Sequence, residues 1–105
     1  MSGGNRLGRN QALPEPMQGR WLGGDEDTET LVVDGSDVSY QGQPILYDWF
    51  TVSTEDGALN VNFGVDDPTR QDSFASENLC GLVISPEGEF LGWNTRFGTS
   101  FVRAA

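Results

Sequence analysis

Apolar and polar residues alternate over several short stretches of the chain, with the period of two that half-buried strands show. Residues 58–63 give the clearest example, because Leu59, Val61 and Phe63 are separated by asparagines. Residues 89–94 and 100–103 repeat the pattern more briefly, and residues 73–84 predict a second long strand with a bend. No stretch has the period of an amphipathic helix, so the pattern favours an all-β protein.

Residues 45–53 form the strongest candidate strand. In a regular strand, one face would carry Ile45, Tyr47, Trp49 and Thr51, and the other would carry Leu46, Asp48, Phe50 and Val52. Both faces are largely apolar, so one of them is either covered by another element or exposed as a patch. The outward face of this stretch is therefore either covered by the N-terminal arm or a long loop, or exposed as a binding surface. The sequence leaves both alternatives open.

Short turns separate the candidate strands. Asp34-Gly35 and Glu55-Asp56-Gly57 contain the glycine that supplies a positive φ in tight hairpins, and Pro86-Glu87-Gly88 has the chemistry of another turn. Counting the candidates gives about eight strands, which is enough to close a small barrel. We therefore predict an antiparallel up-and-down meander that forms a small barrel or a flattened β-clam. A β-sandwich and a partly open SH3-like barrel are the competing architectures.

The stretch 17–23 has the features of a first barrel strand. Gly19 permits a bend, and Trp21, two residues later, shares its face of the strand and can lie across a barrel mouth. The chain ends in a short alternating run that finishes near Arg103, and the closing strand of a barrel pairs with the opening one. We therefore expect the Arg103 guanidinium to stack on the Trp21 ring.

This arrangement resembles the signature of the calycins, the lipocalin and fatty-acid-binding barrels. The resemblance is carried by Gly19, Trp21 and Arg103, and residues 31–42 also resemble the second and third strands of bacterial lipocalin-like domains. The resemblance implies a small bacterial lipocalin-like barrel in which these three residues have a structural role. It also implies that the barrel binds a small apolar molecule.

The length of 105 residues allows one domain with a single core. Residues 1–16 contain little that can bury, so we predict a flexible, disordered N-terminal arm before a single barrel domain at residues 17–105. Arg6 and Arg9 make this arm the net-basic part of an acidic chain. The arm either lies loosely on the body, contacts a partner or has no role.

The charge balance disfavours two classes of partner. The formal net charge is −10, and all six basic residues are arginines. Repulsion of phosphate then argues against nucleic acid and against an anionic membrane surface. No apolar run is long enough to span a bilayer, and the N-terminus lacks the apolar core of a signal peptide, so we expect a cytoplasmic protein.

The sequence lacks the side chains of several common active sites. It has no histidine and one cysteine, Cys80, which leaves no intramolecular disulfide, no Cys/His zinc site and no histidine-assisted nucleophile. We interpret Cys80 as a small buried apolar residue. The acidic residues between 25 and 29 do not have the spacing of a calcium loop, and Asp48 is the remaining acid–base candidate. We expect no enzyme activity, no metal and no cofactor.

Two functions remain. In the first, the protein binds a small apolar ligand through aromatic side chains, and the candidate ligand-binding residues are Tyr40, Tyr47, Trp49, Phe63 and Trp93. The same aromatic residues can instead fill the interior of so small a barrel. In the second, the protein is an interaction scaffold or an inhibitor-like barrel that uses its N-terminal arm or residues 45–53. Either a monomer or an isologous homodimer fits this pattern.

Overall fold

The computed structural model describes residues 6–24, 28–77, 79–94 and 96–104, without the side chains of residues 75–77. The strands in this part of the chain are β1 (Leu7–Gly8), β2 (Gly19–Gly23), β3 (Glu29–Asp34), β4 (Asp37–Tyr40), β5 (Gln43–Pro44), β6 (Trp49–Glu55), β7 (Ala58–Gly64), β8 (Gly81–Ile84), β9 (Phe90–Trp93) and β10 (Gly98–Arg103). A short 3-10 helix, η1 (Glu15–Met17), precedes β2, and an α-helix, α1 (Gln71–Glu77), lies between β7 and β8.

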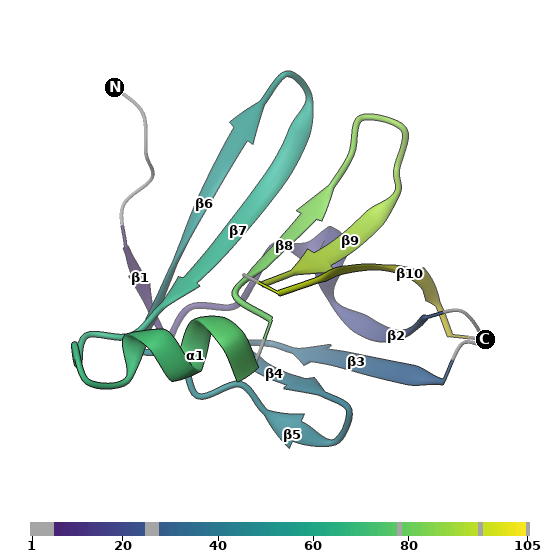
Figure 1. Cartoon of the computed structure of the whole chain (residues 1–105). Coiled ribbons are helices and arrows are strands. Elements are labelled where there is room, and N and C mark those ends of the chain that lie inside the picture. Colours follow the sequence, from purple (N-terminus) through teal and green to yellow (C-terminus); the bar gives the residue numbers. More distant parts are fainter. Residues whose placement is uncertain (1–5, 25–27, 78, 95, 105) are drawn as a thin grey trace.

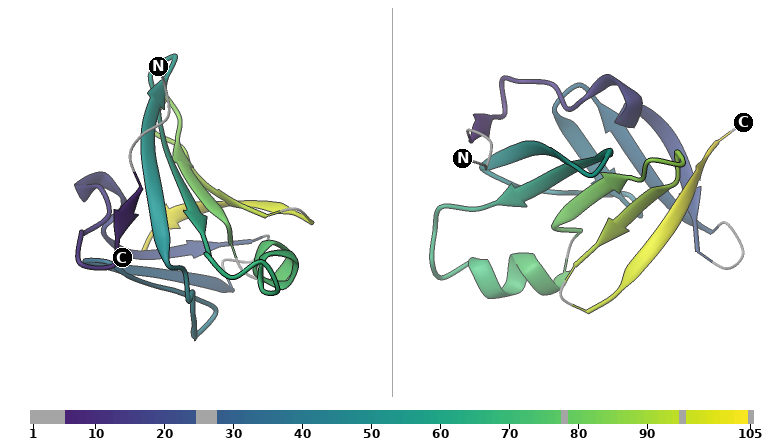
Figure 2. Two further views of the ribbon diagram at one scale, coloured as in Figure 1. Left: turned by 90° about the vertical axis from the view of Figure 1, so that its left-hand side faces the viewer. Right: turned by 90° about the horizontal axis from the view of Figure 1, so that it is seen from above.

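These strands form one sheet that curls into a half-barrel (Figure 1). The order is β1-β6-β7-β8-β9-β10-β2-β3-β4-β5, and every neighbouring pair is antiparallel. Figure 2 shows the β6–β7 and β8–β9 hairpins standing up from the layer formed by β3, β4 and β5. The prediction of an all-β antiparallel meander is confirmed, although the described strands number ten. The count of about eight missed β1 and β5, because a two-residue strand has no alternation to detect.

The first and last strands of the predicted barrel pair as expected. Arg103 lies opposite Trp21 in the ladder between β10 and β2, and its guanidinium carbon lies 4.2 Å from the centre of the indole ring. The Trp21 side chain is buried, and its Nε1 donates to the carbonyl of Met17 at 3.0 Å. The predicted cation–π pair is therefore confirmed.

Gly19 allows the Arg103 guanidinium to reach this position. Its φ is +122°, and a Cβ at residue 19 would lie 2.5 Å from Nη1 of Arg103. The same Nη1 donates to the carbonyl of Gln18 at 2.9 Å, so the guanidinium is held where the Cβ would be. A side chain at this position would meet both backbone strain and a steric clash.

Gly19→Ala should lower the free energy of unfolding by about 1–3 kcal/mol, through strain and clash together. Gly88→Ala is the matched control, because Gly88 also has a positive φ, +93°, but nothing lies within 4 Å of its Cβ position. Urea denaturation should show the larger loss for Gly19→Ala. Equal losses of unfolding free energy in Gly19→Ala and Gly88→Ala would contradict the clash. The clash would also be contradicted if the excess loss of Gly19→Ala stayed the same when Arg103 is replaced by alanine.

The stretch 45–53 is not one continuous strand. Ile45 and Tyr47, which the predicted alternation assigns to one face, are both buried. Phe50 and Leu46 are assigned to the other face, but Phe50 is also buried whereas Leu46 is 60% exposed. The predicted alternation is therefore wrong beyond Tyr47. The strand β6 begins at Trp49.

A bulge at the start of β6 causes this change of face. The N–H of Asp48 donates to the carbonyl of Gly64 at 2.8 Å, and the next residue, Trp49, is also the ladder partner of Gly64. Two consecutive residues therefore oppose one residue of β7, which shifts the alternation by one position. Before the bulge, the N–H of Ile45 donates to the carbonyl of Val38 on β4 at 2.8 Å. Residues 45–48, which connect β5 to β6, are therefore hydrogen-bonded to β4 at one end and to β7 at the other.

The predicted long strand at 73–84 is also corrected. Residues 71–77 form α1, and the strand β8 begins at Gly81. The Asp67 carboxylate accepts hydrogen bonds from the N–H and hydroxyl of Thr69 at 2.9 and 2.8 Å, which fixes the turn that leads into the helix. The helix packs Phe74, which is 7% exposed, against the core.

The segment before β2 lies against the sheet from Arg6 onward. Leu13 is 3% exposed, which corrects the expectation that residues 1–16 hold little that can bury. The N–H of Leu13 donates to the carbonyl of Gly35 at 3.0 Å, and β1 pairs with β6. Residues 1–5 of the predicted arm lie outside the described residues, and the flexibility of the arm stays a prediction.

Arg9 connects two parts of the sheet that no ladder joins in the described residues. Its guanidinium carbon lies 4.5 Å from the centre of the Tyr47 ring, and Nη1 donates to the carbonyls of Ile45 and Tyr47 at 3.3 and 3.2 Å. Nη2 lies 3.2 Å from the Asp37 carboxylate on β4. One side chain therefore links β4 to the segment that leads into β6.

Arg9→Ala should lower the free energy of unfolding by about 1–3 kcal/mol, since it removes the ring contact and leaves the two carbonyls without this donor. Arg20→Ala, at an exposed arginine of β2, is the matched control for loss of one positive charge, and we expect a change within about 0.5 kcal/mol. Urea denaturation measures both. Equal effects of the two substitutions would mean that Arg9 acts only through its charge.

Candidate functional site

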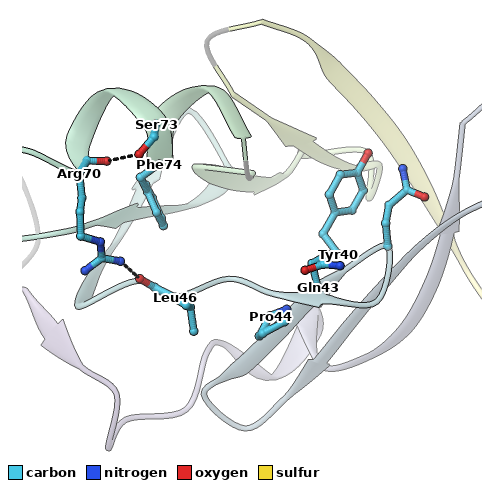
Figure 3. A pocket seen from close by; sticks show the side chains of 8 residues that line it. Tyr40, Gln43, Pro44, Leu46, Arg70, Ser73 and Phe74 are labelled. Atoms are coloured by element: carbon cyan, nitrogen blue, oxygen red, sulfur yellow. Dashed lines mark hydrogen bonds between the residues drawn. The ribbon is translucent and has the colours of Figure 1, made fainter.

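A groove of about 530 Å³ opens between the β4–β5 hairpin and helix α1. Figure 3 shows Tyr40, Gln43 and Pro44 on one side, and Arg70, Ser73 and Phe74 on the other. The residues that line the groove are Tyr40, Gln41, Gln43, Pro44, Leu46, Arg70, Ser73 and Phe74. The volume lies within the range of small-molecule sites, roughly 300–1,000 Å³.

A tight turn and one hydrogen bond position Tyr40 at the rim of the groove. Tyr40 pairs with Gln43 across a turn whose residues Gln41 and Gly42 have φ values of 57° and 80°. Two residues of positive φ make the turn compatible with the twist of the hairpin. The Tyr40 hydroxyl donates to the Glu29 carboxylate on β3. The tyrosine is thus fixed at both its backbone and its hydroxyl.

Arg70 fixes the opposite side of the groove. Its Nη2 donates to the carbonyl of Leu46 at 2.9 Å, and its Nη1 lies 3.9 Å from the Asp48 carboxylate. Asp48 also accepts the N–H of Asp66 at 2.8 Å, so the loop before α1 is tied to residues 46–48. The acid–base candidate Asp48 is thereby bonded within the fold. Leu46, held between these contacts, presents a largely exposed apolar side chain at the groove.

A second, smaller cavity of about 270 Å³, here named the tryptophan cleft, lies between Trp49 and Trp93. Trp49 lies over Gly64 and Trp93 lies over Gly81, because a Cβ at either glycine would be 2.1 or 2.3 Å from an indole atom. The residues that line the cleft are Trp49, Asn62, Phe63, Gly64, Val65, Gln71, Phe74, Cys80 and Trp93. Phe74 lines both cavities, so α1 lies between the groove and the tryptophan cleft.

The five predicted ligand-binding residues do not lie in one site. Tyr40 lines the groove, whereas Trp49, Phe63 and Trp93 line the tryptophan cleft. Tyr47 lines neither of these cavities. It is 1% exposed, its ring centre lies 4.8 Å from that of Phe63, and Arg9 covers one face.

Of the eight residues that line the groove, the sequence predicted Tyr40 alone as a ligand-binding residue. Leu46, Arg70 and Phe74 are among those that it did not predict. Phe74 falls within the strand predicted at residues 73–84, and Arg70 precedes that strand in a polar stretch. The alternation at 45–53 assigned Leu46 to a regular face, where the bulge instead places it outside the core. The residue types at 45–49 do not mark the bulge, so alternation alone could not place Leu46 at the groove.

The two tyrosines and the cysteine have altered acidity. Burial raises the pKa of Tyr40 to about 12, and the hydrogen bond and charge of Glu29 add to the rise. Burial also raises the pKa of Tyr47 and that of the Cys80 thiol. Cys80 is half-buried and packs against the core, so its thiol is held protonated at neutral pH.

The acidic candidates for a metal site are described only in part. Residues 25–27 lie outside the described residues, while Glu29 accepts the Tyr40 hydroxyl. Within the described ranges, no group of three or more Asp, Glu or Cys side chains is gathered as a metal site would require.

Comparisons of the chain with protein-family models, with curated proteins and with solved structures give no match. The half-barrel of antiparallel strands is compatible with a calycin-like fold. None of the helices in the described residues has both the length and the apolar character needed to cross a membrane.

The raised pKa values predict a measurable alkaline titration. The chain has two tyrosines, and Tyr40 should ionise at about pH 12 in the folded protein, against about 10 when unfolded. Because the folded-state pKa is the higher one, the stabilising effect of the protonated hydroxyl is complete below about pH 10 and is lost as the pH rises toward 12. Tyrosinate absorbance and urea denaturation should show both effects.

Tyr40→Phe is the matched variant for this titration. It keeps the ring and removes the hydroxyl, so the high titration should disappear and the alkaline loss of stability should become smaller. Ionisation of Tyr40 at the ordinary pH of a solvated tyrosine would contradict the burial of its hydroxyl against Glu29.

Proposed function

We propose that this protein is a non-enzymatic binding domain, and that the groove between the β4–β5 hairpin and α1 is its site for a small, largely apolar molecule. The observation that carries the proposal is Leu46, whose side chain is 60% exposed although it lines a concave groove. An apolar ligand that covers Leu46 would remove this surface from water, which favours binding.

The polar groups of the groove give the ligand an orientation. Arg70 and Ser73 lie on the α1 side, and Gln41 and Gln43 lie on the hairpin side. These four polar residues make up half of the groove lining, and placed polar groups fix the orientation of a ligand in small-molecule sites. We therefore expect a ligand with an apolar body and a hydrogen-bonding or anionic end that lies near Arg70.

The interior of the half-barrel gives less support to a ligand site. Tyr47 packs there against Phe50 and Phe63, whose ring centres lie 5.9 and 4.8 Å from its own. Phe90 and Trp21 fill the other end, with ring centres 4.4 Å apart. Core packing of this kind leaves the groove as the better site.

A calycin-type origin of the half-barrel is part of the proposal. It is supported by the positions of Gly19, Trp21 and Arg103, which lie together where β2 pairs with β10. The alternative function, an inhibitor-like barrel with a free N-terminal arm, has less support from Arg6 and Arg9. Both side chains contact aromatic rings of the body, at 3.9 and 4.5 Å.

Ligand-observed NMR on the full chain, with a panel of apolar amines, alcohols and carboxylates, tests the groove. Leu46→Glu should weaken the binding of any hit about tenfold or more, since it replaces the apolar contact with a charge. Val102→Glu is the matched control, because Val102 is 58% exposed and lies on β10 away from the groove lining. We expect it to bind as the unmodified chain does.

A third variant separates the two cavities. Trp93→Ala alters the tryptophan cleft and leaves the groove lining intact. Binding that survives Leu46→Glu but is lost in Trp93→Ala would place the ligand in the tryptophan cleft and contradict the proposal. Absence of any hit across the panel would contradict the ligand-binding function as stated.

A further inference from the structure

The two edges of the sheet are protected to different degrees. The β5 edge has two residues, and one of them, Pro44, has no N–H to offer to a further strand. At the opposite edge, all seven residues of β6 pair with β7 on one side. On the side away from β7, β1 pairs with Trp49 and Phe50, and none of the described residues pairs with residues 51–55 on that side.

Backbone groups of this open stretch point away from β7 at alternate residues. The hairpin closes with the pair of Glu55 and Ala58 across a two-residue turn, and such a closing pair is hydrogen-bonded. Because the pattern alternates, Val52 and Thr54 direct their N–H and C=O groups to the open side. Residues 51–55 contain neither lysine nor proline, the residues that commonly block an exposed edge.

The strand β1 demonstrates the kind of segment that this edge accepts. Leu7 and Gly8 pair in antiparallel register with Phe50 and Trp49. Beside them, the guanidinium carbon of Arg6 lies 3.9 Å from the centre of the Trp49 ring. An extended, arginine-bearing segment is therefore already a partner of β6.

The charge near the open stretch is negative. Glu55 and Asp56 are exposed at the tip of the β6–β7 hairpin, and the formal net charge of the chain is −10. A second copy of the chain would bring a like charge to this edge, which disfavours self-association. A basic segment has the complementary charge.

We propose that residues 51–55 of β6 bind an extended, arginine- or lysine-rich segment of another protein as an added antiparallel strand. The backbone groups of Val52 and Thr54 form the hydrogen bonds of the added strand. The carboxylates of Glu55 and Asp56 attract its basic side chains. This surface shares no residue with the groove lining, so its test is independent of the ligand-binding function.

The test uses the full chain and a short fluorescein-labelled peptide in which arginine and valine alternate. Fluorescence anisotropy should show saturable binding that weakens with added salt. NMR hydrogen exchange should show slower exchange of the Val52 and Thr54 amides in the complex. The Ser53 amide, which faces β7, should not change. A peptide with glutamate in place of arginine should not bind.

Two variants separate the backbone and charge contributions. Thr54→Pro should weaken peptide binding about tenfold, because it removes a backbone donor at the open side. Combined Glu55→Gln and Asp56→Asn should weaken it about threefold and reduce the salt dependence. This charge variant keeps the backbone and decides the question if Thr54→Pro does not fold. Combined Glu15→Gln and Asp34→Asn removes two charges outside the hairpin and should leave binding unchanged.

Slow exchange of the Val52 and Thr54 amides in the free protein would overturn the proposal, because the edge would already be occupied. If that protection is independent of protein concentration, the occupant is the chain's own N-terminal segment. If it increases with concentration, the occupant is a second copy. Equal binding of the acidic peptide, or amide changes confined to another surface, would also overturn the proposal.

Discussion

The ladder between β10 and β2 holds the sheet together. In the strand order, β1 and β6–β9 lie on one side of this ladder and β3–β5 lie on the other. Its side-chain support is the Arg103 guanidinium, which stacks on Trp21 and donates to the carbonyls of Gln18 and Pro16 at 2.9 and 3.4 Å. One arginine therefore fixes both β10 and the segment that leads into β2. The requirement for glycine at residue 19 follows from the space that this guanidinium occupies.

The sheet curls without a ladder between β5 and β6 in the described residues, and this incomplete closure positions the groove. Residues 45–48 connect β5 to β6 and reach from β4 to β7 across this gap, with their side chains alternating between the core and the outside. Ile45 and Tyr47 enter the core while Leu46 remains outside, facing the space beside α1. Two arginines hold residues 45–48 by their carbonyls: Arg9 donates to those of Ile45 and Tyr47, and Arg70 donates to that of Leu46.

Sequence reasoning recovers the features that depend on neighbouring residues. Alternation predicts β7, and the glycine-containing turns predict the hairpins, while Gly19, Trp21 and Arg103 identify the meeting of the first and last strands. It fails at residues 45–53, because a bulge reverses the alternation without a compositional mark. It fails at α1 because a helix of two turns that buries Phe74 has no period to detect. Of the groove it finds Tyr40, whereas Leu46 and Arg70 meet only because the β6–β7 ladder brings the segments before β6 and after β7 together.

The two tryptophans of the cleft have a consequence for how the sequence can vary. Each indole occupies the space above a glycine on the adjacent strand, Trp49 over Gly64 and Trp93 over Gly81. A side chain at either glycine therefore requires its tryptophan to move away or to be replaced by a smaller residue. The two positions of each pair should therefore covary: related sequences with a larger residue in place of the glycine should have a smaller residue in place of the tryptophan.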